Sequence, residues 1–191
     1  MGRIVESQFE FFAHYEVEQL ERIDRSGGVR VLGFPGATKL DPQQEMADRP
    51  IIRVRPASGV PWVGVFNGGS YGSPPAARGR LIGWPDGRSV CVVYAGGGVV
   101  VPSDAPDEGF EIESFPITGV LVVAKAEVVV FSDFTSFTAY DANGLRWRAE
   151  VASDDTTLTE VEDGTVAGYG FLNGVDRHPI RLDLTTGRAV N

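Results

Sequence analysis

The side chains that most often catalyse reactions or bind metals are scarce in this chain of 191 residues. It has two histidines, His14 and His178, and one cysteine, Cys91. Zinc sites combine His and Cys ligands at short spacings, and neither a His-Glu-x-x-His nor a Cys-x-x-Cys pattern occurs. A phosphate-binding loop ending in Gly-Lys is also missing. We therefore expect no catalytic residues, no cofactor and no metal site.

Each of these three residues has a structural explanation. Cys91 lies in the apolar run 90–94, Val-Cys-Val-Val-Tyr, so we expect a buried, unreactive thiol. His14 follows several aromatic residues, where a half-buried ring is more typical than a catalytic base. His178 precedes Pro179 in a stretch that we expect to be an exposed loop. A single cysteine also excludes a disulfide within the chain.

Carboxylates are plentiful, and their spacing favours turns over metal sites. Asp141-Ala142-Asn143-Gly144 resembles the start of a calcium loop but has no later ligands at the required spacing, so we interpret it as a tight turn. Two carboxylates that meet in space can perform acid–base catalysis, and the sequence does not show which acids meet. A small hydrolase or lyase that uses carboxylates in a cleft is therefore an alternative function.

The negative charge is concentrated in one part of the chain. Residues 104–163 contain 14 acids and three bases, a net charge of −11, whereas the remainder carries +2 of the total of −9. Such an acidic face argues against nucleic-acid binding, which depends on Lys and Arg at phosphates. It permits a basic protein partner, although an acidic surface also serves solubility alone. The candidate partner-binding acids are Asp154, Asp155, Glu160 and Glu162.

Aromatic residues near a glycine-rich loop form a second candidate surface. Trp62, Tyr71 and Trp84 lie within or beside the loop 67–75, and exposed aromatic clusters often bind partners. The alternative is that these rings fill the core or anchor the loop. Three segments have no counterpart elsewhere in the chain, and we expect function to reside on them: 67–75, 102–109 and 171–179.

The composition and patterning predict an all-β fold. The 24 glycines and 12 prolines are spread along the chain, which suits short strands and turns and disfavours long helices. The stretch 121–147 is the clearest example, with three strands joined by two turns. Its last strand alternates so that Leu145 and Trp147 are expected on a buried face and the flanking arginines in solvent. We expect antiparallel meanders in a propeller-like or sandwich arrangement.

The first 50 residues look less regular than residues 51–191, although we expect a single domain over 1–191. In the segment 15–25, apolar residues near helical spacing favour one short helix that ends at Gly27-Gly28, and a strand is the alternative. A helical turn over 42–47 would begin after Asp41. At most one or two short helices are therefore expected, all near the N-terminus.

One short motif occurs twice. The segment 139–147 aligns with 181–189, so that Asp141 matches Asp183 at a spacing of 42 residues. An apolar strand, a turn, Asp, a glycine turn and then Trp147 resemble the repeats of quinoprotein-type (PQQ-like) β-propellers, over about 121–190. The resemblance implies propeller-like strand order, and the second copy lacks the Trp. The whole chain also resembles small uncharacterised bacterial proteins that end in Asp-Leu-x-Thr-Gly-Arg, which implies no function.

The sequence favours a binding function. No signal peptide and no apolar run of about 18 residues is recognisable, so we expect a cytoplasmic bacterial protein that does not bind membranes. The absence of a catalytic set and the acidic face favour a non-enzymatic binding or interaction protein. An immunity-type inhibitor of a basic protein is one concrete form. A structural subunit of a larger assembly is a further alternative.

Overall fold

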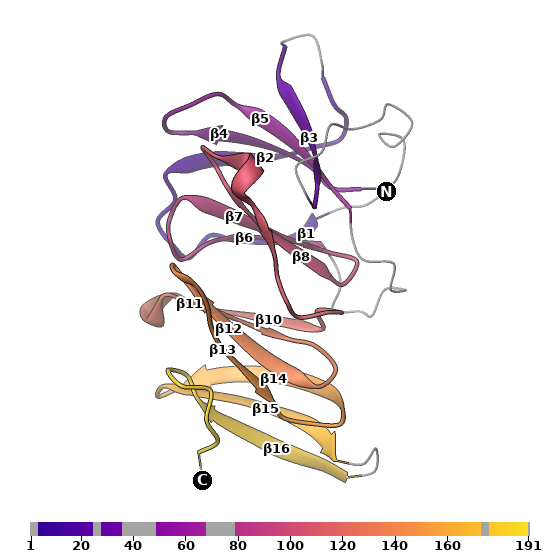
Figure 1. The fold of residues 1–191 in the computed structure, drawn as a ribbon, viewed down its shortest axis with the longest axis vertical. Helices are drawn as coiled ribbons and strands as arrows, with labels where there is room; N and C mark the ends of the chain where they lie inside the picture. The colour runs from indigo at the N-terminus through magenta and orange to yellow at the C-terminus, as the bar shows by residue number, and fades with distance from the viewer. Residues whose placement is uncertain (1–3, 25–27, 36–48, 68–78, 173–175, 191) are drawn as a thin grey trace. The chain divides into compact units, whose positions relative to one another are not determined.

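The computed structural model describes residues 4–24, 28–35, 49–67, 79–172 and 176–190, and within them the protein is all-β, as expected. Among these described residues, regular structure consists of strands and two short 3-10 turns (Figure 1). The 3-10 turns are η3 (Pro106–Glu108) and η4 (Ala124–Ala126). The strands are β1 (Ile4–Gln8), β2 (Tyr15–Leu20), β3 (Arg30–Phe34), β4 (Ile51–Pro56), β5 (Trp62–Phe66), β6 (Gly79–Gly83), β7 (Ser89–Tyr94), β8 (Gly97–Pro102), β9 (Phe110–Glu111), β10 (Gly119–Val123), β11 (Val128–Ser132), β12 (Ser136–Asp141), β13 (Gly144–Glu150), β14 (Asp154–Glu162), β15 (Thr165–Leu172) and β16 (Asp176–Asp183).

The helix favoured for 15–25 is wrong, and the alternative strand is correct. β2 pairs antiparallel with β4, from Tyr15 opposite Pro56 to Leu20 opposite Ile51. The buried Tyr15 and the partly buried Val17 lie two positions apart, which is the strand period. Pairing with β4 therefore overrides the weak helical spacing, as strand preference depends strongly on tertiary context. The helical turn predicted for 42–47 lies outside the described residues.

The chain forms two compact units, Met1–Ile112 and Glu113–Asn191. The first unit holds a sheet of order β1-β6-β7-β8-β9 and a sheet of order β2-β4-β5-β3. Most neighbours pair antiparallel, and two pairs are parallel, β1 with β6 and β3 with β5. Side chains of both sheets share one apolar core, which includes Phe34, Ile52, Trp62, Val90 and Val101. The prediction of a single domain is not tested by this division and stays a prediction.

The second unit also packs two sheets around one core. Its sheets have the orders β10-β11-β12-β13 and β14-β15-β16, and every pair is antiparallel. The shared core includes Val130, Phe137 and Trp147 from the first sheet and Val166 and Ile180 from the second. Antiparallel meanders therefore form in both units, as the alternating pattern predicted.

Cys91 is fully buried in β7, as expected. Its surroundings exclude water, and this burial raises the pKa of the thiol. The thiolate, which is the reactive form, is therefore disfavoured. The prediction of a buried, unreactive cysteine agrees with this environment.

Two hairpins contain the same Asp-x-x-Ser turn. Between β6 and β7, the Oδ1 atom of Asp86 accepts hydrogen bonds from the amides of Arg88 and Ser89, and Oδ2 accepts one from the Ser89 hydroxyl at 2.6 Å. Between β11 and β12, Asp133 accepts the equivalent bonds from Thr135 and Ser136, again with 2.6 Å to the hydroxyl. Each aspartate thus satisfies backbone donors that the hairpin leaves unpaired.

The sequence repeat marks equivalent places in the two sheets of the second unit. Asp141 ends β12, the third strand of its sheet, and Asp183 ends β16, the third strand of the other. After each turn the chain folds back, since Trp147 pairs with Ala139 and Ala189 pairs with Leu182. The repeat therefore reflects one local hairpin used twice.

The tryptophan of the first copy covers the turn of the second. Its Nε1 donates to the carbonyl of Leu184 at 2.7 Å. A Cβ at Gly187, where φ is +68°, would lie 2.6 Å from the indole ring of Trp147. Trp147 is 8% exposed, so the expected burial is confirmed. The tryptophan of the first copy thus packs against the turn of the second copy, which has Ala189 at the matching position.

Leu145 departs from the predicted alternation and is 47% exposed. Opposite Ala139 and Tyr140, which are consecutive, lie Trp147 and Leu145, which are two apart. The extra residue, Arg146, forms a β-bulge, and a bulge interrupts the in–out alternation of a strand. Trp147 therefore faces the core while Leu145 faces solvent.

The pKa of the Asp183 carboxyl is expected to lie below its ordinary value. The Thr186 hydroxyl donates to Oδ1 at 2.8 Å, and the amides of Thr186 and Thr185 donate to the same atom. These bonds favour the charged form and lower the pKa, the Thr186 hydroxyl most strongly. The stability they supply is present above the ordinary pKa of aspartate and is lost as the pH falls through the folded-state value.

A carboxyl carbon NMR titration measures this pKa. Thr186→Val is expected to move the pKa of Asp183 back toward the ordinary value. Thr185→Val keeps the backbone donor and serves as the matched control, with little change expected. An ordinary pKa for Asp183 in the unmodified protein would contradict the turn geometry.

Candidate functional site

The four predicted partner-binding acids lie on one strand. Asp154, Asp155, Glu160 and Glu162 belong to β14, and all four are exposed. β14 is an edge strand of its sheet. Among the described residues, no Lys or Arg forms an ion pair with any of the four carboxylates. Their negative charge therefore faces solvent, and no basic side chain among the described residues neutralises it.

Two bulges decide which way the side chains of β14 point. The register shifts between Asp154 and Thr157, where Asp155 has a φ of +49°, and again between Leu158 and Glu160. Because of the second shift, Leu158 and Val161 both pack against the core although three positions separate them. Glu160 and Glu162 consequently face solvent. Bulges and charges on an edge strand also prevent unwanted strand pairing, so the acids have a structural use of their own.

An exposed aromatic residue lies next to the acidic strand. Tyr169 of β15 is 39% exposed and pairs with Thr157 of β14. The guanidinium of Arg177, on β16, lies 4.3 Å from the centre of the Tyr169 ring, within the range of a cation–π contact. Tyrosine and arginine are common anchors at protein interfaces. The sheet therefore presents acids at one edge and an exposed aromatic–arginine pair beside them.

The predicted aromatic surface is not formed by the two tryptophans. Trp62 is 1% exposed and Trp84 is 2% exposed, so both belong to the core of the first unit. The Trp62 ring packs against Phe34 with 5.7 Å between ring centres, and its Nε1 donates to the Ser103 carbonyl at 2.7 Å. Burial leaves neither ring available to a partner, which corrects the prediction for these two residues. Tyr71 lies outside the described residues.

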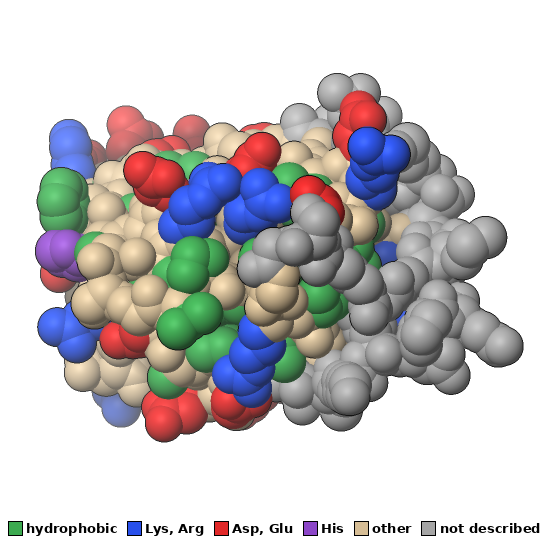
Figure 2. Space-filling view, turned by 90° about the horizontal axis from the view of Figure 1, so that it is seen from above, with side chains coloured by type: hydrophobic (Ala, Val, Ile, Leu, Met, Phe, Trp, Pro, Cys, Tyr) green, Lys and Arg blue, Asp and Glu red, His purple; other side chains and the backbone are tan. Residues whose placement is uncertain are grey.

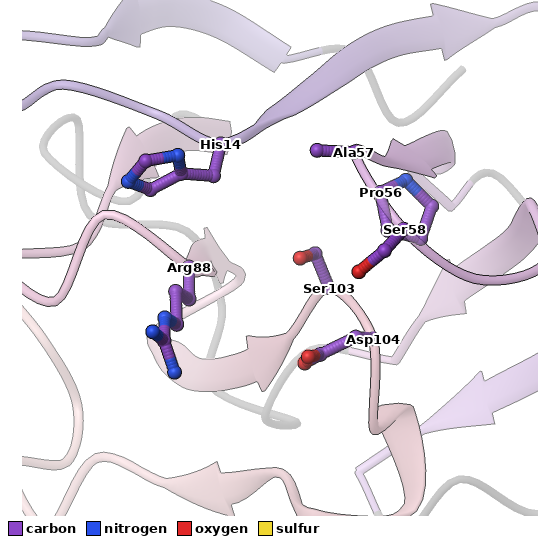
Figure 3. A pocket seen from close by; sticks show the side chains of 7 residues that line it. All are labelled: His14, Pro56, Ala57, Ser58, Arg88, Ser103 and Asp104. Carbon is purple, nitrogen blue, oxygen red and sulfur yellow. The ribbon is translucent and has the colours of Figure 1, made fainter.

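A pocket of about 360 Å³ opens between four turns of the first unit (Figure 3). The segment before β2 contributes His14, and the turn after β4 contributes Pro56, Ala57 and Ser58. Arg88 comes from the turn before β7, and Ser103 with Asp104 from the segment after β8. These residues span 90 positions of sequence between His14 and Asp104, so only the packing of the strands brings them together.

Backbone hydrogen bonds hold the four turns of this pocket in place. The amide of His14 donates to the Gly87 carbonyl at 2.8 Å, and the amide of Ala57 donates to the His14 carbonyl at 2.9 Å. The amide of Ser103 donates to the Arg88 carbonyl at 2.9 Å. The Ser103 carbonyl in turn accepts from Trp62. The pocket walls are therefore tied to one another and to the core.

The polar groups of the pocket divide by charge. In Figure 3, His14 and Arg88 lie on one side of the opening, and Ser58, Ser103 and Asp104 lie on the other. Within the described residues, Arg88 and Asp104 form no ion pair with each other or with another side chain. A cation and an anion thus face the same space without neutralising each other directly.

The sequence indicated few of the residues that line this pocket. His14 was expected to be half-buried, but its ring is exposed and packs edge-on against Phe12, with 4.8 Å between ring centres. Ser103 and Asp104 fall in the predicted functional segment 102–109, which is the one signal that pointed here. The prediction that His178 lies in an exposed loop is also wrong. His178 lies within β16 and is only partly exposed.

Further findings limit the chemistry of the described residues. They contain no group of three His, Cys, Asp or Glu side chains placed to hold a metal ion. They also contain no helix long and apolar enough to cross a membrane. Figure 2 shows one face of the molecule, on which basic and acidic side chains are interspersed with hydrophobic ones. Some opposite charges of the first unit form ion pairs between neighbouring strands. The Arg53 guanidinium of β4 lies 3.2 Å from the Glu18 carboxylate of β2.

Comparison with known proteins assigns no family. No protein-family model matches the chain, and no curated protein matches it. The crystal structure of AztD from Citrobacter koseri aligns with 75% of this chain, with a TM-score of 0.47 and 11% sequence identity. This chain spans only 41% of the AztD chain. A likeness this distant supports no conclusion about fold or function, and the resemblance to PQQ-like repeats stays a prediction.

Proposed function

We propose that this protein is a non-enzymatic binding protein that recognises a basic protein partner through β14. The observation that carries the proposal is the set of four exposed carboxylates on one edge strand, which have no basic partner among the described residues. An immunity-type inhibitor, which covers a basic surface of its target, is the concrete form we favour. We further propose that it acts in the cytoplasm, as expected from the sequence.

Charge and local geometry both support this proposal. The second unit contains twelve acids and six bases, so its net charge is −6. Opposite charge on a partner would accelerate the encounter, and a salt-dependent association rate is the usual sign of such steering. Tyr169 and Arg177 lie beside the acidic strand and supply the kind of side chains that anchor an interface.

Replacing the four acids by amides is expected to abolish capture of a basic partner. The variant combines Asp154→Asn, Asp155→Asn, Glu160→Gln and Glu162→Gln, which keeps shape and removes charge. Asparagine suits position 155 because it tolerates the positive φ found there. Affinity capture from the native host identifies the partner, and the dissociation constant is then measured with the purified partner at several salt concentrations.

A control variant removes the same charge elsewhere. Four exposed glutamates are replaced by glutamine in it: Glu108, Glu111, Glu113 and Glu127. Retained binding by the control and loss of binding by the β14 variant would support the proposal. Equal loss in both variants, or no basic protein recovered by the unmodified chain, would count against it.

A hydrolase is the second candidate, and one sequence feature favours it. Gly68-Gly69-Ser70-Tyr71-Gly72 has the Gly-x-Ser-x-Gly spacing of a nucleophile elbow. This segment lies outside the described residues, so its geometry does not contribute to the argument. Ester hydrolysis that Ser70→Ala abolishes would favour a serine hydrolase, whereas hydrolysis that only carboxylate substitutions abolish would favour the predicted acid–base mechanism. Light scattering tests the remaining alternative, a subunit of a larger assembly.

A further inference from the structure

The pocket between His14 and Asp104 has features of a built ligand site, and the acidic strand does not involve it. Its volume of about 360 Å³ lies at the small end of the range for ligand pockets. Four turns from sequence-distant strands contribute its lining, and backbone hydrogen bonds fix each turn. A pre-formed pocket of this kind does not have to be ordered when a ligand binds, which favours affinity.

Two serine side chains add hydrogen-bonding groups to the pocket. Ser103 is only 4% exposed, and its backbone is held on both sides, since its amide donates to the Arg88 carbonyl and its carbonyl accepts from Trp62. Figure 3 shows the Ser103 hydroxyl directed into the pocket. A hydroxyl held in this direction can donate a hydrogen bond to a bound molecule or accept one from it. The Ser58 hydroxyl lies on the same side and offers a second donor or acceptor.

The two charged side chains of the pocket, Arg88 and Asp104, define which charged groups a ligand must carry. Arg88 presents a guanidinium, which binds carboxylates through paired hydrogen bonds. The imidazole of His14 lies on the same side. Asp104 presents a carboxylate from the opposite side and suits an ammonium group. A ligand with a carboxylate and an ammonium group would satisfy both charges at once, whereas a simple anion would lie close to Asp104.

We propose that this pocket binds a small zwitterion of the size of an amino acid or a dipeptide. The carboxylate of the ligand pairs with Arg88 beside His14, its ammonium group pairs with Asp104, and the Ser103 hydroxyl completes the contacts to the bound molecule. The proposal does not depend on recognition of a protein by β14, because the two sites belong to different units of the chain.

NMR titration of the full chain tests the proposal. The probes are the twenty common amino acids and glycylglycine, with acetate and methylammonium as the two charged halves. We expect at least one zwitterion to give saturable shifts at the amides of His14, Ala57, Ser103 and Asp104, with a dissociation constant below about 1 mM. Acetate and methylammonium are expected to bind at least about tenfold more weakly, because each satisfies only one charge.

Variants then separate the two charges. Arg88→Gln and Asp104→Asn are each expected to raise the dissociation constant about tenfold or more, and Ser103→Ala about threefold to tenfold. Arg181→Gln and Asp163→Asn change exposed residues of the second unit and are expected to leave binding unchanged. The proposal is overturned if no zwitterion gives saturable shifts at these amides. It is also overturned if acetate binds as tightly, or if Asp104→Asn has no effect in a folded variant.

Discussion

Replacing Trp62 by alanine is expected to lower the free energy of unfolding by about 3–5 kcal/mol, the usual range for a large buried aromatic residue. The ring is 1% exposed and packs against Phe34 in the core of the first unit. Its removal leaves a cavity and also leaves the Ser103 carbonyl without the indole donor. Urea unfolding followed by circular dichroism measures the change.

Two further variants make the Trp62 result specific. Trp62→Phe keeps much of the packing and removes the hydrogen bond to Ser103, so a loss of about 1–3 kcal/mol is expected. Val60→Ala changes a side chain that is 77% exposed and is expected to alter stability by less than about 0.5 kcal/mol. If Trp62→Ala is as stable as the unmodified protein, the ring is not a core residue, and its assignment to a binding surface is restored.

The Trp62 prediction also bears on the pocket. The indole of Trp62 donates a hydrogen bond to the carbonyl of Ser103. The hydroxyl of the same serine is directed into the pocket (Figure 3). Trp62→Phe is therefore expected to weaken zwitterion binding even at temperatures where the variant stays folded. NMR titration of this variant with the best zwitterion measures the effect. Unchanged binding would show that the pocket does not depend on this hydrogen bond.

Replacing Asp133 by alanine is expected to lower the free energy of unfolding by about 3 kcal/mol or more. Asp133 is 3% exposed and accepts hydrogen bonds from the Thr135 amide, the Ser136 amide and the Ser136 hydroxyl. Each buried donor that loses its acceptor costs about 1–3 kcal/mol. The loss of the carboxylate also removes the ion pair with Arg148, at 3.6 Å, which contributes little because Arg148 is partly exposed.

The equivalent turn of the first unit provides the matched comparison. Asp86 makes the same three kinds of hydrogen bond, but its turn is partly open to solvent. Water can replace the acceptor of the exposed Arg88 amide, whereas Ser89 is buried, so Asp86→Ala is expected to cost about 1–2 kcal/mol, less than Asp133→Ala. Urea unfolding of both variants measures the difference. Equal losses in the two variants would contradict the importance of burial at Asp133.

The strands were largely predictable because their signals are local. The apolar run 90–94 lies in β7, and the stretch 121–147, expected to hold three strands joined by two turns, contains β11, β12 and the start of β13. The repeat of Asp141 and Asp183 also reflected real local geometry, since both residues end the third strand of a sheet. The segment 15–20 failed because its weak periodicity fits two structures, and the long-range pairing with β4 decides between them.

Side-chain direction was less predictable, because a single bulge or buried contact changes it. Leu145 faces solvent because Arg146 is an extra residue in its strand. Trp62 and Trp84 lie close to a loop in sequence, which left a binding surface and the core both open, and both rings fill the core. Proximity along the chain does not reveal on which face of a sheet a ring lies when the register is unknown.

The sequence by itself determined the all-β class, the positions of most strands, the negative charge of residues 104–163 and the scarcity of His and Cys. These properties depend on composition and on periodicity over a few residues. Only the tertiary structure decided that β14 is an edge strand, and that His14, Arg88, Ser103 and Asp104 meet at one pocket. The reason is physical: local alternation encodes a strand, whereas strand pairing and core packing select its neighbours and so decide which distant turns converge.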